Sequence, residues 1–143
     1  MCREEGLALS ELAARSDKPL DGFELFGIVK ETGVDDEGLR EFHSKFYDYP
    51  LYKNEGLEFY KALGSGKLGF TSMLKLLFGY RSVTKRMKSK NIDGNLVGEG
   101  LVKGGVIIFD KKGKPKYSYQ EVTGNQMPVD DITAAVQSIK EES

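Results

Sequence analysis

The residue best suited to chemistry in this 143-residue chain is its only cysteine, Cys2. A helix is predicted over Arg3–Arg15, because Leu9, Leu12 and Ala13 recur at helical spacing. Cys2 then stands at the start of that helix, where unpaired backbone N–H groups and the helix dipole favour a thiolate. A thiolate in this position can attack a peroxide or a disulfide, or resolve a covalent intermediate.

The surroundings of Cys2 leave two interpretations open. Arg3 adds a positive charge beside the thiol, which favours a redox-active thiolate. The alternative is an ordinary cysteine near a chain end with no special reactivity. A thiol oxidised to sulfenic acid needs a second thiol to reduce it, and one cysteine allows no disulfide within the chain. Glutathione, thioredoxin or a second copy of the chain would have to supply that thiol, so a homodimer is one alternative.

Composition narrows the class of protein. Hydrophobic residues make up 39% and charged residues 30%, which is typical of a folded globular chain, and the length predicts a single domain over residues 1–143. Lys and Arg total 21 against 22 Asp and Glu, a balance that argues against nucleic acid as the main partner. One cysteine and one histidine argue against a zinc site, and no cofactor is indicated.

No segment predicts a membrane or export signal. The longest apolar stretches, Leu76–Phe78 and Val106–Phe109, are too short to span a bilayer. The first residues lack the basic-then-apolar pattern of a signal peptide. We therefore expect a reducing, cytoplasm-like compartment, with organelle import open if an N-terminal extension precedes Met1.

The elements that must position the cysteine alternate between helices and strands. Helices are predicted over Arg3–Arg15, after Asp35–Glu37, over Gly56–Leu63, over Thr71–Lys90 and from Pro128, and strands over Phe23–Lys30, Tyr49–Tyr52, Val106–Phe109 and Lys116–Val122. The last two strands form a hairpin, and a glycine-rich loop over Gly94–Gly100 precedes them. This order indicates an α/β protein with a mixed sheet flanked by helices.

A basic run follows the middle of the longest predicted helix. Its members are Arg81, Lys85, Arg86, Lys88 and Lys90. A solvated helix face is the simplest interpretation. Binding of an anionic ligand, such as RNA, an anionic membrane or an acidic protein, is the alternative.

Several stretches carry a resemblance to a known family. Cys2–Glu5 opens like an active-site helix, Leu51–Gly64 is similar to a strand-turn-helix that ends in Tyr-Lys-x-Leu-Gly, and Gly94–Gly100 with Gly104–Phe109 is similar to a loop and first hairpin strand. In this order and spacing they resemble the thioredoxin-like, peroxiredoxin-like family of AhpC/TSA-type antioxidant proteins that includes prostamide/prostaglandin F synthase.

The resemblance implies a thioredoxin-like fold and a Cys-x-x-Cys site. Cys2 would be the second cysteine of that site, and Arg3 would follow it and weakly stabilise its thiolate. The first cysteine and the central strand before it have no counterpart here, so the resemblance implies an N-terminally truncated domain. Thioredoxins keep a cis-proline before the hairpin strand, whereas this chain has Gly104 and Gly105, as the family does. These glycines would let a substrate approach the backbone closely.

The function implied is that of a thiol-dependent oxidoreductase. Its substrate would be a peroxide or endoperoxide, its reductant thioredoxin or glutathione, and its redox residue Cys2. The alternative from a different class is a catalytically inactive thioredoxin-like interaction or regulatory module, because the first cysteine of the pair is missing.

Overall fold

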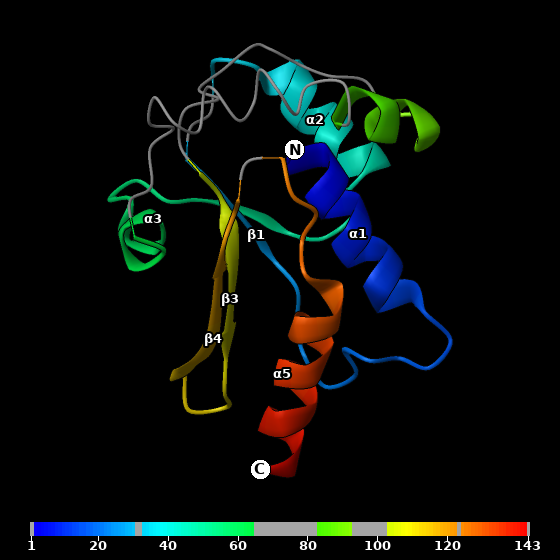
Figure 1. The fold of residues 1–143 in the computed structure, drawn as a ribbon. Helices are drawn as coiled ribbons and strands as arrows, with labels where there is room; N and C mark the ends of the chain where they lie inside the picture. Colours follow the sequence, from blue (N-terminus) through cyan, green and yellow to red (C-terminus); the bar gives the residue numbers. More distant parts are fainter. Residues whose placement is uncertain (1, 31–32, 65–82, 93–102, 123, 143) are drawn as a thin grey trace.

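The computed structural model describes residues 2–30, 33–64, 83–92, 103–122 and 124–142, with only the backbone of Cys2 described. Its elements are α1 (Cys2–Ala14), β1 (Gly27–Val29), α2 (Asp36–Lys45), β2 (Leu51–Lys53), α3 (Glu58–Ala62), β3 (Gly105–Phe109), β4 (Pro115–Gln120) and α5 (Val129–Glu141), and residues 83–89 are also helical (Figure 1). The order matches the predicted alternation, so the α/β class is confirmed.

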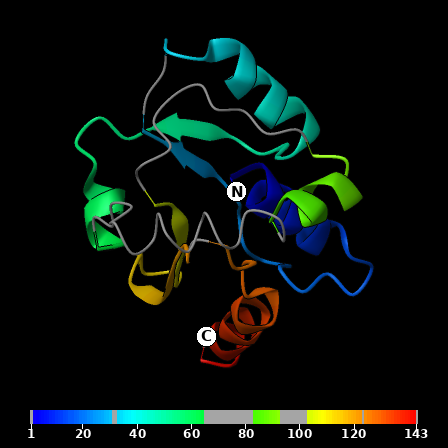
Figure 2. The same ribbon diagram turned by 45° about the horizontal axis from the view of Figure 1, so that its top comes forward.

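The described strands form two separate sheets of two strands each. β1 pairs with β2 in parallel, with Gly27 opposite Leu51. β3 and β4 form the predicted antiparallel hairpin. Asp110 closes its turn by accepting hydrogen bonds from the backbone N–H groups of Lys112 and Lys114, both at 2.9 Å. Figure 2 shows the β1–β2 pair and the β3–β4 hairpin as distinct pairs.

The hydrophobic core lies where α1, α5 and the hairpin meet. Leu12 of α1 and Ile132 and Val136 of α5 are each only 2% exposed. Ile108 of β3 and Met127, just before α5, join the same cluster. The spacing of the α5 residues, four apart, places them on one helix face. This packing fixes the direction of α1 and hence the position of its first turn.

A second contact holds α1 against α2. Gly6 is buried in α1, and a Cβ atom at this position would lie 2.8 Å from the ring of Phe42. The absence of a side chain lets the two helices approach closely, which offsets the cost of glycine inside a helix. Ser10 Oγ donates to the carbonyl oxygen of Phe46 at 3.0 Å, just beyond the end of α2.

Three predicted segments differ from the structure or lie largely outside the described residues. The strand expected over Phe23–Lys30 is limited to β1, whose three residues are only partly buried. The only partner of β1 among the described strands is β2, which has three residues. So short a partner cannot pair with a longer β1 or bury its side chains. The loop Gly94–Gly100 and most of the helix Thr71–Lys90 lie outside the described residues. No helix in the described part of the chain is long and apolar enough to cross a membrane.

Candidate functional site

The first turn of α1 is the centre of the candidate site. Cys2 is the first residue of this 13-residue helix, as the sequence predicts. The first N–H groups of an α-helix have no partner within the helix, so this end favours an anion such as a thiolate. The redox role of Cys2 stays a prediction, and the description of the site rests on the residues that follow it.

Arg3 is held by α2. Its guanidinium donates to Glu41 Oε2 at 2.6 Å and lies 5.3 Å from the centre of the Phe46 ring. The pKa of Glu41 is lowered, chiefly by hydrogen bonds from Lys45 and Arg3. The Glu41 carboxylate balances part of the positive charge of Arg3. Stabilisation of a Cys2 thiolate by Arg3 therefore also stays a prediction.

Glu4 forms a buried ion-pair cluster with Arg86 and Lys90. Its carboxylate lies 2.7 Å from Arg86 Nε and 3.3 Å from Lys90 Nζ, and its side chain is only 6% exposed. Arg86 also donates to the carbonyl oxygen of Gly124 at 3.3 Å. Burial alone would raise the pKa of Glu4, but the hydrogen bonds and charges of Arg86 and Lys90 outweigh it and lower the pKa.

The cluster revises the interpretation of the basic run. Arg86 and Lys90 neutralise a carboxylate of α1 instead of facing water as free cations. Lys85 and Lys88 are exposed, and Arg81 lies outside the described residues. The basic run therefore positions the first turn of α1 through two of its members.

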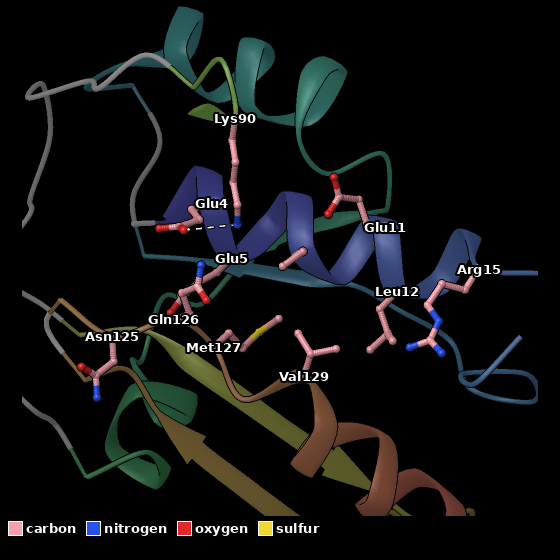
Figure 3. A pocket seen from close by; sticks show the side chains of 11 residues that line it. Glu4, Glu5, Glu11, Leu12, Arg15, Lys90, Asn125, Gln126, Met127 and Val129 are labelled. Carbon is pink, nitrogen blue, oxygen red and sulfur yellow. Dashed lines mark hydrogen bonds and ion pairs between the residues drawn. The ribbon is translucent and has the colours of Figure 1, made fainter. Parts of the chain in front are cut away.

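A pocket of about 270 Å³ lies along α1, against the segment that leads into α5. Leu12 of α1 lies opposite Met127 and Val129 (Figure 3), and Ala8 also lines the pocket. The other lining residues are polar or charged, and among them Glu4 and Glu5 lie closest to Cys2 in the chain. The pocket therefore combines an apolar part with carboxylates from the first turn of α1.

Glu5 differs from its neighbour Glu4 in its contacts. No hydrogen bond or ion pair joins Glu5 to another described residue. Its pKa is raised to about 7 by burial and by the negative charges of Glu121 and Glu4, against a smaller opposing effect of the N-terminal ammonium group. A carboxyl group with this pKa exchanges its proton near neutral pH, which suits acid–base chemistry.

The predicted glycines lie beside this acidic group. Gly104 N–H donates to Oε2 of the buried Glu121 at 3.1 Å, so Gly104 and Glu5 share a neighbour. At Gly105 a Cβ atom would lie 2.0 Å from the carbonyl oxygen of Tyr119, within the hairpin. Strand pairing thus explains the glycine at 105. Approach of a substrate to either backbone position stays a prediction.

Sequence reasoning missed the carboxylates of this site. Glu4 is buried, and the apolar spacing of α1 does not reveal this. Its partner Arg86 is 82 positions away, so no local pattern could reveal the pair. For Glu5 a weak signal existed, since Cys2 and Glu5 are three positions apart, the spacing of positions on one helix face.

Comparison with known proteins assigns the family. The family model for AhpC/TSA antioxidant enzymes matches residues 8–123. Prostamide/prostaglandin F synthase of Salmo salar is 31% identical over 141 residues, covering 95% of this chain and 68% of the relative. The human protein of that name is 31% identical over 137 residues, covering 92% and 66%, and the Bos taurus protein is 30% identical over 141 residues, covering 95% and 67%. No solved structure matches significantly.

The chain therefore belongs to the thioredoxin-like, peroxiredoxin-like family of AhpC/TSA antioxidant enzymes. The prediction of this family from the sequence is confirmed. The family match begins at residue 8, so it does not include Cys2. A redox function of the antioxidant type follows for the chain at the level of the family, and the activity itself is a matter for proposal.

Proposed function

We propose that this protein is a thiol-dependent enzyme that reduces a peroxide or endoperoxide, with Cys2 as the reacting thiol. The observation that carries the proposal is the position of Cys2 at the first residue of α1, in a chain of an antioxidant enzyme family. The named relatives are synthases, which favours an enzyme over a binding module.

The chemistry follows from the helix end. With a hydroperoxide, the Cys2 thiolate attacks the terminal oxygen, a sulfur–oxygen bond forms as the O–O bond breaks, and the other oxygen leaves as an alkoxide that takes up a proton. Cys2 becomes a sulfenic acid, and the hydroperoxide is reduced to an alcohol, or to water if it is hydrogen peroxide. One thiol of the reductant then forms a mixed disulfide with Cys2 and releases water, and a second thiol restores the free cysteine. With an endoperoxide, whose two oxygens both carry carbon, Cys2 instead becomes a sulfenate ester, and the reductant thiol that attacks it releases an alcohol in place of water.

Within residues 1–143 Cys2 is the only cysteine, so these residues need a thiol from elsewhere to complete the cycle. Thioredoxin and glutathione are the reductants of this chemistry in reducing compartments such as the cytoplasm, where we propose that the protein acts. A second copy of the chain is the other source of a thiol, and it would make a homodimer part of the cycle.

The test compares the unmodified chain with Cys2→Ser. Consumption of hydrogen peroxide and of cumene hydroperoxide is followed with thioredoxin or glutathione as reductant. We expect turnover in the unmodified chain and only background consumption in Cys2→Ser. Equal, background-level consumption by both would contradict an enzyme and favour the inactive interaction module, which the lack of a second cysteine supports.

The two small sheets support a related proposal about the fold. β1 pairs only with β2 and β3 only with β4 among the described strands. We propose that a central strand, encoded upstream of Met1, joins the two pairs into one thioredoxin-like sheet and carries the first cysteine of a Cys-x-x-Cys site. Extending the chain by the upstream in-frame residues should raise its urea unfolding midpoint. An extended chain with an unchanged midpoint would argue against this strand.

A further inference from the structure

The pocket along α1 has one end that the proposed thiol chemistry does not yet use. Glu5 lines this end, and Ala8, Leu12, Met127 and Val129 give the pocket an apolar part. In Figure 3, Glu5 lies on the side of α1 toward the segment that carries Gln126 and Met127, while Lys90 reaches Glu4. A carboxyl group with no ion pair to a described side chain, in a pocket and one turn from Cys2, needs an explanation.

The groups around Glu5 disfavour its negative charge. The charged and titratable groups nearby are Glu4, Glu11, Arg15 and the N-terminal ammonium group on the α1 side, Lys90 beyond the 83–89 helix, and Tyr119 and Glu121 at the end of the hairpin.

The two side-chain cations among these groups have other partners. Lys90 lies 3.3 Å from Glu4, and Arg15 lies 2.6 Å from Asp17. The N-terminal ammonium group lowers the pKa of Glu5, but burial, Glu121 and Glu4 outweigh it and raise the pKa to about 7. The carboxyl group therefore exchanges its proton near neutral pH.

We propose that Glu5 is the general acid of the reaction at Cys2, and that the pocket behind it holds the organic group of a hydroperoxide. This inference rests on the proposed peroxide reduction and adds a second catalytic residue to it. The Cys2 thiolate attacks the terminal oxygen and breaks the O–O bond. Glu5 gives its proton to the departing alkoxide, so the products are the sulfenic acid of Cys2, an alcohol and the Glu5 carboxylate. Water reprotonates Glu5 before the next turnover.

The proton has a clear chemical value. An alkoxide is a poor leaving group at neutral pH, and a positioned acid typically accelerates such a step by about 10²- to 10⁴-fold. The acid is most effective when its pKa lies near the working pH, which is where the surroundings of Glu5 hold it. The Glu4 carboxylate cannot substitute, because Arg86 and Lys90 keep it ionised.

The test follows oxidation of Cys2 by cumene hydroperoxide in a single turnover, without reductant. Sulfenic acid is trapped with dimedone and counted by mass spectrometry at a series of pH values. The unmodified chain should show a rate that rises as Cys2 ionises and falls above about pH 7 as Glu5 loses its proton. Glu5→Gln should lose the falling limb and react about 100-fold more slowly near pH 6. The matched control is Glu37→Gln, an exposed carboxylate in the first turn of α2, which should match the unmodified chain.

A second variant changes the pKa of Glu5 and leaves its carboxyl group in place. Glu121→Gln removes a negative charge that raises the pKa of Glu5, so the falling limb should move to lower pH. An unchanged rate in Glu5→Gln and an unmoved limb in Glu121→Gln would overturn the role of Glu5 while leaving that of Cys2 intact. If the unmodified chain forms no dimedone adduct at Cys2, the proposed function fails, and the role of Glu5 fails with it.

Discussion

Two adjacent carboxylates in the first turn of α1 have opposite surroundings. Both line the pocket, but Glu4 is held by Arg86 and Lys90, whereas Glu5 has no ion pair with a described side chain. The pKa is lowered for Glu4 and raised to about 7 for Glu5. The comparison shows that helix position alone does not set the charge of a side chain, because both residues lie near the same positive helix end. The elements packed against each face decide it.

The largest effect should come from breaking the Glu4 side of this pair. Arg86→Met leaves a buried carboxylate with only Lys90 nearby, which should cost about 3 kcal/mol of unfolding free energy. Urea denaturation at neutral pH measures the loss. The double variant Glu4→Gln/Arg86→Met removes the unpaired charge and should recover much of the stability. A single variant as stable as the unmodified chain would show that the cluster does not hold α1 in place.

The glycines beside Glu121 should respond very differently to a methyl group. Gly105→Ala places a Cβ atom 2.0 Å from the Tyr119 carbonyl oxygen, so the hairpin must shift, at a cost of about 2 kcal/mol. At Gly104 the nearest atom to a new Cβ is Glu121 Oε2 at 3.7 Å, so Gly104→Ala serves as the control and should unfold near the original midpoint. Equal thermal midpoints for the two variants would contradict the strand-pairing explanation of Gly105.

The pH dependence of stability separates Glu4 and Glu5. The folded-state pKa of Glu5 is raised above 4.5, so its contribution is fully present below about pH 4.5 and is lost as pH rises through about 7. The folded-state pKa of Glu4 is lowered, so its contribution is present above 4.5 and is lost as pH falls through the lowered value.

Urea midpoints measured across this range test both signs. Stability of the unmodified chain should decline between about pH 5 and pH 8, and Glu5→Gln should flatten that decline, because the amide has no proton to lose. Glu4→Gln should leave the decline in place. A Glu5→Gln variant with the original slope would mean that another group causes it.

The smallest effect should come from the more exposed ion pair on the α2 side. Glu41→Gln removes the carboxylate that Arg3 contacts at 2.6 Å, but solvent screens this pair, so the unfolding midpoint should shift less than in Arg86→Met or Gly105→Ala. The informative readout is the rate of Cys2 alkylation by iodoacetamide. If Arg3 stabilises the thiolate, releasing it from Glu41 should raise that rate near neutral pH, and Arg3→Gln should lower it. Equal rates in both variants would remove Arg3 from the site.

The sequence predicted the order of elements because that order depends on local patterns. The apolar positions Ile132, Val136 and Ile139 recur at helical spacing in α5 and are buried as expected. The turn between β3 and β4 follows from Asp110 and Gly113. The Asp110 side chain accepts backbone hydrogen bonds within the turn, and Gly113 adopts the positive φ of 73° that the turn needs.

The candidate site was only partly predictable. Cys2 at the start of a helix was visible from spacing and residue type. The state of Glu4 and Glu5 depends on Arg86 and Glu121, which are more than 80 positions away and become neighbours only in the folded chain. Local patterns contain no signal for such contacts. The short β1 has a similar cause, since the length of a strand depends on the strands available to pair with it.

The most direct test of the central claim is to identify the product of peroxide at Cys2. The intact chain is treated with one equivalent of hydrogen peroxide in the presence of dimedone, and the adduct is located by peptide mass spectrometry. The proposed function predicts one adduct per chain at Cys2. The adduct should form much faster than on the isolated peptide of residues 1–6, which contains the same cysteine without the folded helix. A chain that reacts no faster than that peptide would contradict a redox-active thiol at the start of α1.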